Sequence, residues 1–488
     1  MSLQPVANSL VALPPARPRT RPVQTPDKEP RPVRHRTRSV PAPQKEPPPA
    51  RHRTRTAKPD RYAEQLLHLW RIGSLEPSEI TRREEARLRA YSREQTKIWQ
   101  EKVAALISAG SFHKAERAAR QMRRKLGVRL HVSLEAGRKA VPSDTLADLE
   151  TLRLRRLQVA FKLLKNVNCY DRGASARVWS KRKPSGNGTR PICTFGWMDH
   201  ARQHLLGASL QPFVGFHSSQ TLLRLGEGGR GLTAARKALL MALEGCGDEH
   251  VFVQIDVQDF FGSISHEWLE SNLPLDRGTI RRHIHTGEMN LQFKDEACQQ
   301  NVRLSRTARR AIPQGSALSQ LIAELVMAEV LREVVAPPGV QIITYCDNIG
   351  IIMPKGCEAV VKELMRAAFE QHNAGPFKLT ISEPVPVTQE FEFLGLSFIV
   401  EEERPKVEVP EKVWGTWLCQ IGDDVLVANM AALEDLERKV LGKIAQWRMW
   451  SGADELKADA LGLIENQREA LSSWSNGEDS SPPQPAAQ

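Results

Sequence analysis

The sequence predicts an α+β fold in which helical segments flank a central segment of strands. Between residues 60 and 166, apolar residues recur at spacings of three and four with basic residues between them, which is the pattern of amphipathic helices. From residue 174 onward, short apolar runs such as HVFVQIDV at 250–257 are bounded by turn-forming residues, as strands are. The helical pattern returns between 400 and 475 and includes five tryptophans.

The totals for the chain favour an intracellular protein with an anionic partner. At 488 residues the chain is long enough for several domains, and it carries a net charge of +12. No apolar run has the length of a membrane span, and the proline-broken start MSLQPVANSLVALPPARPRTR indicates no secretory signal. The seven cysteines are scattered and form no CxxC pair, which argues against a zinc site or a disulfide framework. We therefore expect a cytoplasmic location and no membrane association.

Most of the excess charge lies in residues 1–60. This tail holds 13 Lys and Arg against 4 Asp and Glu, and 14 of the 32 prolines. RPRTR at 17–21 recurs as RHRTR at 34–38 and 51–55, each 17 residues further on. Such a segment buries too little apolar surface to offset its ordering entropy, so we expect disorder or polyproline structure. The spaced arginines favour salt-sensitive binding to nucleic-acid phosphates, and the alternative is that the tail is a solubilising linker.

The helical segment 61–170 and the strands after it can be placed from local signals. FHKAERAARQMRRKLG at 112–127 reads as one helix, and Ser143 and Asp144 are candidate caps for a helix that runs to about 167. Its basic runs favour contact with nucleic acid over the alternative of a solvated basic face. ASARVWSKRKPSGNGTRPICTF at 174–195 reads as strand, turn, strand. Helices follow to about 244, another begins near Ser316, and a hairpin is expected over 340–353.

Two acids close apolar strands 91 residues apart. Asp256 ends the strand VFVQID, and Asp347 stands between VQIITYC and NIGIIM. If these strands lie side by side, the two carboxylates meet at one edge of a sheet, where their repulsion favours a bound divalent cation. Magnesium prefers such oxygen ligands together with substrate phosphates, so the chemistry indicated is two-metal phosphoryl transfer. The alternative is that both acids sit at ordinary strand ends facing water.

Five segments in order resemble the motifs of reverse transcriptases. These are DVQDFF at 256–261, IPQGSALSQ at 312–320, TYCDNI at 344–349 and FEFLGLSF at 391–398, preceded by RPICTF at 190–195. The resemblance implies a right-hand polymerase fold: fingers and an antiparallel-sheet palm over 171–400 and a helical thumb over 401–475. The segment 61–170 is then a helical N-terminal extension, and 476–488 is a disordered tail.

The resemblance also assigns roles to residues. Asp256, the Val257 carbonyl and Asp347 match the metal ligands for two Mg²⁺ ions, with Mn²⁺ as an alternative. Several kinds of residue are matched around the nucleotide and the primer. Lys183 and Arg190 match residues that hold the triphosphate, Phe261 matches an aromatic ring against the sugar 2′ position, and Gln314 and Gly315 match the pair beside the incoming nucleotide. Phe393, Leu394 and Gly395 match the primer grip, and Lys378 is a candidate for the general acid that protonates the leaving group. A core aromatic is the alternative for Phe261.

This chain departs from the family pattern at three places. The family usually has a second aspartate where Asn348 stands, a proline where Gln320 stands, and a lysine near the position of Glu383, so that Lys378 comes slightly early. An amide in place of an acid removes one negative charge. We therefore expect Asn348 to weaken or retune metal binding and to leave activity in place.

The function implied is an RNA-directed DNA polymerase similar to unassigned bacterial reverse transcriptases linked to antiphage defence. Its expected partners are an RNA template, a DNA product or primer, deoxynucleoside triphosphates, and a structured RNA or protein. The alternatives are a template-independent or RNA-synthesising polymerase on the same palm, and a non-catalytic nucleic-acid-binding protein that keeps the fold.

Overall fold

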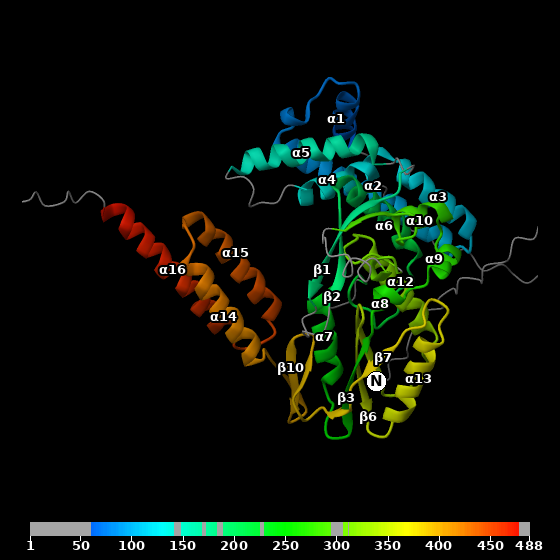
Figure 1. The fold of residues 1–488 in the computed structure, drawn as a ribbon, viewed down its shortest axis with the longest axis vertical. Helices are drawn as coiled ribbons and strands as arrows, with labels where there is room; N and C mark the ends of the chain where they lie inside the picture. Colours follow the sequence, from blue (N-terminus) through cyan, green and yellow to red (C-terminus); the bar gives the residue numbers. More distant parts are fainter. Residues whose placement is uncertain are drawn as a thin grey trace, which may run out of the picture.

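The computed structural model describes residues 60–140, 148–167, 172–182, 189–224, 229–293, 306–310 and 312–477. The predicted tails lie outside these ranges except for Asp60 and residues 476–477, and the latter two belong to the helix that ends at Gly477. The described chain is a mixed α+β structure, as predicted. Figure 1 shows an N-terminal group of helices at one end, strands below it, and three C-terminal helices that extend to one side. None of the described helices has both the length and the apolar character needed to cross a membrane.

The N-terminal group comprises the helices α1 (Arg61–Arg71), α2 (Arg82–Ser108), α3 (Phe112–Arg124), α4 (Leu126–Ala140) and α5 (Leu149–Asn166). The single helix expected over 112–127 is two helices, because the chain turns out of the helical region at Lys125, where φ is −74° and ψ is 129°. The expected caps Ser143 and Asp144 lie outside the described residues. Asp148 caps α5 instead, since its carboxylate accepts from the backbone N–H groups of Glu150 and Thr151.

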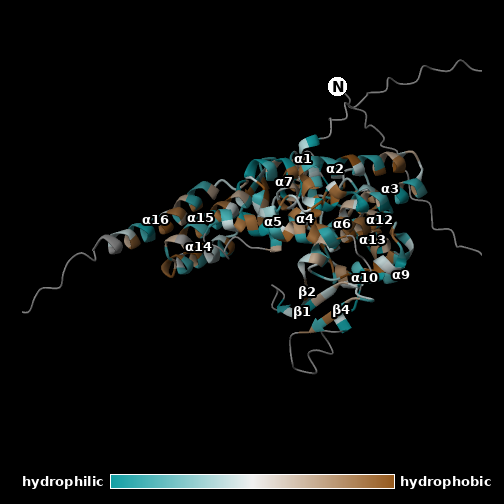
Figure 2. Cartoon of the chain, turned by 90° about the horizontal axis from the view of Figure 1, so that it is seen from above, coloured by the Kyte–Doolittle hydropathy of each residue, from teal (hydrophilic) through white to brown (hydrophobic). Residues whose placement is uncertain are grey.

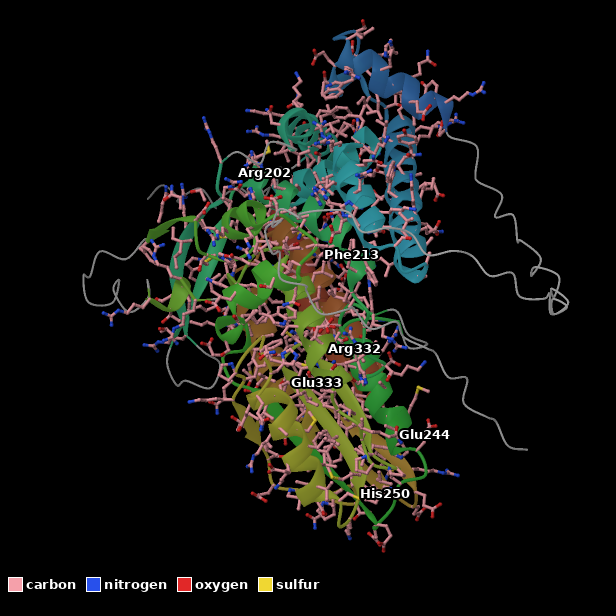
Figure 3. All side chains as sticks on the ribbon, turned by 90° about the vertical axis from the view of Figure 1, so that its right-hand side faces the viewer. Arg202, Phe213, Glu244, His250, Arg332 and Glu333 are labelled. Atoms are coloured by element: carbon pink, nitrogen blue, oxygen red, sulfur yellow. The ribbon has the colours of Figure 1, made fainter. Side chains whose placement is uncertain are left out.

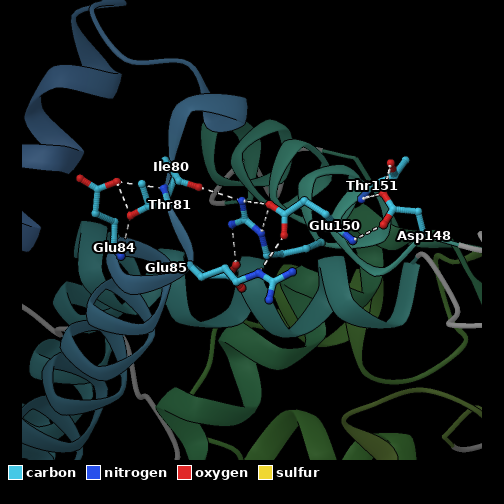
Figure 4. A network of polar contacts seen from close by, with 9 residues as sticks. Ile80, Thr81, Glu84, Glu85, Asp148, Glu150 and Thr151 are labelled. Atoms are coloured by element: carbon cyan, nitrogen blue, oxygen red, sulfur yellow. Dashed lines mark hydrogen bonds and ion pairs between the residues drawn. The ribbon is translucent and has the colours of Figure 1, made fainter.

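An ion-pair network joins the start of α2 to α5 (Figure 4). Arg153 lies 2.6 Å from Glu150 and 3.1 Å from Glu85, and it also donates to the Ile80 carbonyl at 3.0 Å. The Arg153 and Glu85 side chains are only 16% and 12% exposed. Partial burial and shared hydrogen bonds make such a network more stabilising than isolated surface pairs. It fixes how the N-terminal helices pack on one another.

The predicted first hairpin belongs to a three-stranded sheet with the order β2-β1-β4. β1 (Ser175–Arg182) pairs antiparallel with β2 (Thr189–Phe195), and the turn between them lies outside the described residues. β4 (Asn290–Phe293) pairs parallel with β1 and comes from a stretch in which no strand was expected. A parallel partner needs a long connection, so neighbouring residues carry no signal for it. Helix α6 (Trp197–Leu210) follows β2.

The central sheet has the order β5-β6-β3-β7, with β8 also paired to β3. Its strands are β3 (His250–Val257), β5 (Gln341–Tyr345), β6 (Asn348–Pro354), β7 (Leu379–Ile381) and β8 (Val385–Pro386). All of these pairs are antiparallel. The predicted hairpin over 340–353 is therefore present as β5 and β6.

Alternation along β3 gives the central sheet two buried faces. Val251, Val253 and Ile255 pack in the core formed with α12 (Ser319–Arg332) and α13 (Glu358–Glu370). Phe252 packs in a second core with α7 (Leu232–Leu243) and the C-terminal part of the chain. In Figure 3, His250 and Glu244 mark the end of the sheet at which β3 begins, and Arg202 of α6 lies towards the opposite end. Asp256 is thus carried to the end of the sheet nearest the N-terminal helices.

Short helices lead away from β3, and a hairpin leads to the C-terminal helices. The short helices are α8 (Phe260–Ser263), α9 (His266–Asn272) and α10 (Arg277–His283). The hairpin sheet comprises β9 (Phe391–Phe393), β10 (Leu396–Glu401) and β11 (Arg404–Glu408), and the helices are α14 (Glu411–Leu426), α15 (Met430–Trp447) and α16 (Ala453–Gly477). The expectation of a helical segment from about 400 is therefore wrong for its first residues, because the end of β10 and all of β11 lie there and the first helix starts at Glu411. Figure 2 shows these helices extending from the body of the molecule.

Candidate active site

Asp256 and Asp347, the two acids predicted at strand ends, lie together at one end of the central sheet. Asp256 is the cross-strand partner of Asn348, and the Val257 N–H donates to the Asp347 carbonyl at 3.1 Å. Asp347 lies with Cys346 in the two-residue turn between β5 and β6. Cys346 has a φ of 57°, which is unusual for a residue with a side chain. The register of β3 against β6 therefore brings Asp256 and Asp347 to the same edge.

Charged groups from two strands and one turn influence one another at this edge. Burial raises the pKa of the Asp347 carboxyl, and the negative charge of Asp256 raises it further. A backbone hydrogen bond in the turn and the Arg190 guanidinium act in the opposite direction. Arg190 comes from β2, where it pairs with Lys181. The other residue expected to bind phosphate, Lys183, lies outside the described residues.

Asn348 contributes a donor that an acid would lack. Its Nδ2 donates a hydrogen bond to Asp347 Oδ1 over 3.1 Å. A carboxylate at position 348 would be an acceptor only when ionised and would repel Asp347. The amide therefore orients the neighbouring carboxylate as well as lowering the charge of the site.

The donor set fits a hard divalent cation. Asp256 is exposed and Asp347 is partly buried, and Val257 is the last residue of β3, with its N–H bonded to the Asp347 carbonyl. Within the described ranges, no three His, Cys, Asp or Glu side chains are placed to hold a metal ion. Two carboxylates with a carbonyl, completed by water and substrate phosphate, suit magnesium better than zinc. A cation between the acids would also relieve the repulsion that raises the Asp347 pKa.

A glycine brings the loop before α12 against β2. Gly315 has a φ of +110°, and a Cβ added there would lie 2.2 Å from the Cys193 carbonyl oxygen. The Cys193 N–H donates to the Gln314 carbonyl at 2.7 Å. Only glycine permits this approach. The backbone of Gln314 and Gly315 is therefore held against Cys193, which lies three residues after Arg190 on β2. Helix α12 itself begins at Ser319, slightly later than the expected start near Ser316.

Phe261 and Lys378 flank the same end of the sheet. Phe261 is half-buried on α8, packs edge-on against Phe260, and accepts from the Ile312 N–H at 3.2 Å through its carbonyl. Its backbone is therefore joined to the segment that leads to Gln314. Lys378 is exposed one residue before β7, and its carbonyl accepts from Gln258 N–H at 2.9 Å. Lys378 thus lies two residues along the ladder from Asp256.

The segment expected to be the primer grip is a tight turn held by a buried arginine. Leu394 and Gly395 have φ values of 51° and 76° and connect β9 to β10, while Phe393 is buried. Arg236 of α7 donates to the Leu394 carbonyl from Nε at 3.1 Å and Nη2 at 2.6 Å, and to the Gln446 carbonyl of α15 at 2.8 Å. It is 4% exposed. The motif spacing did not indicate Arg236. The available signal was a basic residue among the apolar residues of AARKALL at 234–240, which are expected to face the core.

A second missed residue lies behind the Cys346–Asp347 turn. Glu324 of α12 is fully buried, and burial raises its pKa to about 7. A hydrogen bond from the Cys346 backbone and one from Gln220 Nε2, at 3.1 Å to Oε2, act in the opposite direction. The segment around Gln220 also pairs with β5, because Thr344 N–H donates to the Ser219 carbonyl at 2.9 Å. An acid in the middle of the apolar run LIAELV at 321–326 was the available signal.

Comparison with known families places this site inside a matched domain. Residues 181–398 match the family model described as reverse transcriptase (RNA-dependent DNA polymerase). The matched range contains both acids, Arg190, the Gln314–Gly315 loop and the turn at Leu394. A search of the curated proteins found none that matches the chain.

Proposed function

We propose, because residues 181–398 match the reverse transcriptase family, that the protein is an RNA-directed DNA polymerase that extends a primer 3′ end with deoxynucleotides. The observation that carries this proposal is the meeting of Asp256 and Asp347 at one sheet edge, with Arg190 close enough to lower the Asp347 pKa. Paired carboxylates beside a guanidinium suit the transfer of a nucleotide from a triphosphate.

The acids and the arginine have complementary tasks in this proposal. Asp256, Asp347 and the Val257 carbonyl hold the divalent ions, and Asn348 orients Asp347 through its hydrogen bond. Bound magnesium would stabilise the charge that develops on the phosphoryl oxygens. Arg190 holds the triphosphate, since charge-assisted contacts to phosphate oxygens position the reacting group. Lys378 is the candidate donor of a proton to the leaving pyrophosphate.

The remaining residues select and align the reactants. Gln314 and Gly315 border the incoming nucleotide, and the Phe261 ring excludes a ribose 2′ hydroxyl by its bulk. The Phe393–Gly395 turn aligns the primer strand, where positive φ values let the backbone approach closely. The resemblance to bacterial reverse transcriptases of antiphage defence makes a defence role part of the proposal.

Primer extension tests this function. The full chain should extend a primer on an RNA template with deoxynucleotides and Mg²⁺, whereas ribonucleotides should be used poorly. Asp256→Ala should lower extension at least 1,000-fold, roughly the loss typical of an essential catalytic group, and should still bind the primed template. The exposed acid Asp248 offers a matched control, because Asp248→Ala should leave extension unchanged. Extension by Asp256→Ala at the wild-type rate would refute the metal-site assignment.

Two further observations would redirect the proposal. Product formed without a template would indicate a template-independent polymerase. Binding of nucleic acid with no extension under any combination of metal and nucleotide would indicate a non-catalytic binder. For the defence role, phage should form fewer plaques on cells that carry the wild-type gene than on cells that carry the Asp256→Ala variant.

A further inference from the structure

A cavity of about 360 Å³ lies between the N-terminal helices and the start of α12. Its walls come from α2, α4 and α6 on one side and from Ala317, Gln320 and Leu321 on the other. Gln100 of α2 donates to the Ala208 carbonyl of α6 at 3.0 Å, which fixes one wall. We call this cavity the α6 pocket.

Two side chains of the α6 pocket have a polar atom that lacks a partner among the described residues. Gln203 is fully buried, and its Oε1 accepts from the Ala317 N–H at 3.0 Å. Its Nε2, and the Nε2 of His204 one residue further along α6, have no hydrogen-bond partner within the described part of the chain. A buried polar group without a partner costs roughly 1–3 kcal/mol. Side chains that line a cavity in this state favour a ligand with hydrogen-bonding groups of its own.

The charge of the lining excludes phosphates and metal ions as the natural ligand. Burial lowers the pKa of His204 to about 4, and burial also lowers the pKa of His131, so both imidazoles are neutral at pH 7. Among the described residues, the lining holds one acid, Glu135, and one base, Arg230. Across the described ranges no cluster of three His, Cys, Asp or Glu is suited to a metal. A neutral ligand with both donors and acceptors matches this lining.

We propose that the α6 pocket holds one unstacked nucleobase of the template strand. The pocket combines amides at Gln203, Gln211 and Gln320 with an aromatic ring at Phe216. Amide side chains read the donor and acceptor edges of bases, and rings stack on their faces, in the recognition of single strands. The volume lies within the range of pockets for small ligands. This inference rests on the proposed function, since it needs a template to be bound.

The position of the pocket connects it to the nucleotide-facing loop. Ala317, which donates to Gln203, is two residues after Gly315, whose backbone is pressed against β2. A template base in the α6 pocket would therefore lie against the same loop whose other side borders the incoming nucleotide. Occupancy would fix the template ahead of the base that is being copied.

The test is a scan of single abasic sites along the unpaired 5′ part of an RNA template. The Kd of the full-length protein for each primed template is measured without nucleotides, so that no chemistry contributes. One template position should weaken binding about tenfold when its base is removed, as expected for loss of one stacked and hydrogen-bonded base. Neighbouring positions should have smaller effects.

Variants connect that position to the α6 pocket. Ala208→Leu, which narrows the pocket, and Gln203→Met, which removes the amide, should bind the intact template about tenfold more weakly and should no longer respond to the abasic site. Ala105→Leu is the matched control, because Ala105 is exposed on α2 and does not line the pocket. Melting temperatures identify any variant that fails to fold, and the scan on the wild-type protein does not depend on the variants.

Three results would overturn the inference. One is equal binding for every abasic template, and another is an abasic effect that the pocket variants leave unchanged. The third is saturation of the pocket by free nucleosides, detected as a rise in melting temperature that Ala208→Leu abolishes, while no template position matters. If the protein also extends primers normally, the proposed function survives these results, whereas failure to bind or extend any primed template would refute both.

Discussion

At position 348 an amide stands beside the Asp347 carboxylate, and its Nδ2 donates the hydrogen bond that orients that acid. The same turn is held from behind by Glu324, a buried acid whose burial keeps its pKa near 7. One polar side chain thus faces the site and another supports it. The residue scale therefore determines how much negative charge the site carries and how firmly the turn is held.

The change Asn348→Asp exchanges a donor for a second charge. We expect the Mg²⁺ concentration for half-maximal extension to fall by roughly tenfold, because one additional charge–cation contact contributes about 1–2 kcal/mol. In the absence of metal the melting temperature should fall, since Asp347 loses its donor and gains a repulsive neighbour. Metal titrations of extension and thermal melts measure the two effects, with the exposed Asn373→Asp as control. Loss of extension at every Mg²⁺ concentration would contradict this prediction.

Glu324 should make the stability of the protein depend on pH. Its folded pKa is raised above the unfolded value of about 4.5, so the native state binds more protons between pH 4.5 and 7. Stability attributable to this group is therefore lost as pH rises through that window, by up to ~3 kcal/mol. Glu324→Gln should melt higher than the wild type at pH 8 and close to it at pH 4.5. The exposed Glu363→Gln should show no such pH-dependent difference. The same melting temperature for Glu324→Gln and the wild type at both pH values would contradict the assignment.

At the scale of elements, Arg236 connects three of them. Helix α7, the β9–β10 turn and α15 meet at its guanidinium, which donates to the carbonyl oxygens of Leu394 and Gln446. The turn contains Leu394 at a φ of 51°, a conformation that costs roughly 1–2 kcal/mol for a residue with a side chain. The hydrogen bonds from Arg236 offset that cost. The same side chain therefore sets the position of the C-terminal helices relative to the turn.

Replacing Arg236 should loosen this junction. Arg236→Met keeps the volume of the stem but leaves the carbonyls of Leu394 and Gln446 without their donor, so we expect a loss of about 2–3 kcal/mol in stability. The KM for primed template should rise more than the KM for deoxynucleotides, because the turn borders the primer in the proposed function. Steady-state kinetics and thermal melts measure both. Lys237→Met, at the exposed neighbouring position, is the control, and equal changes in the two KM values would contradict the prediction.

At the scale of the whole molecule, charge is divided between a basic tail and a nearly balanced remainder. Residues 1–60 carry 13 Lys and Arg of the 69 in the chain but only 4 of the 57 acids. The nine arginines of the repeats at 17–21, 34–38 and 51–55 are spaced so that several phosphates can be contacted at once. Long-range attraction of nucleic acid therefore depends on the tail, and alignment depends on the folded part.

The salt dependence of binding tests the role of the tail. Changing the nine repeat arginines to glutamine should make the slope of log Kd against log salt shallower by about 0.7 for each single-strand phosphate that the tail no longer neutralises. Extension at low salt with saturating template should change little. A variant with Pro47, Pro48 and Pro49 changed to alanine keeps all the charge and should keep the slope. An unchanged slope in the arginine variant would show that the tail binds no phosphates and would favour the alternative of a solubilising linker.

The sequence by itself determined the local elements and the candidates at their ends. Strand β3, the β5–β6 hairpin, α6 and α7 follow from periodicity and turn residues, since these signals act over a few neighbouring positions. The types of Asp256 and Asp347 pointed to a metal site in the same way. The cap of α5, the break between α3 and α4, and the start of α12 were misplaced, because several nearby residues could serve equally well.

Tertiary structure alone decided what lies next to what. The parallel pairing of β4 with β1, the contact of Arg236 with Leu394 and Gln446, and the burial of Glu324 behind Cys346 join residues far apart in the chain. The α6 pocket likewise exists only because α2, α4, α6 and α12 converge. Such contacts depend on packing between elements, and the free energy of packing is a property of the assembled core that no local stretch of sequence contains.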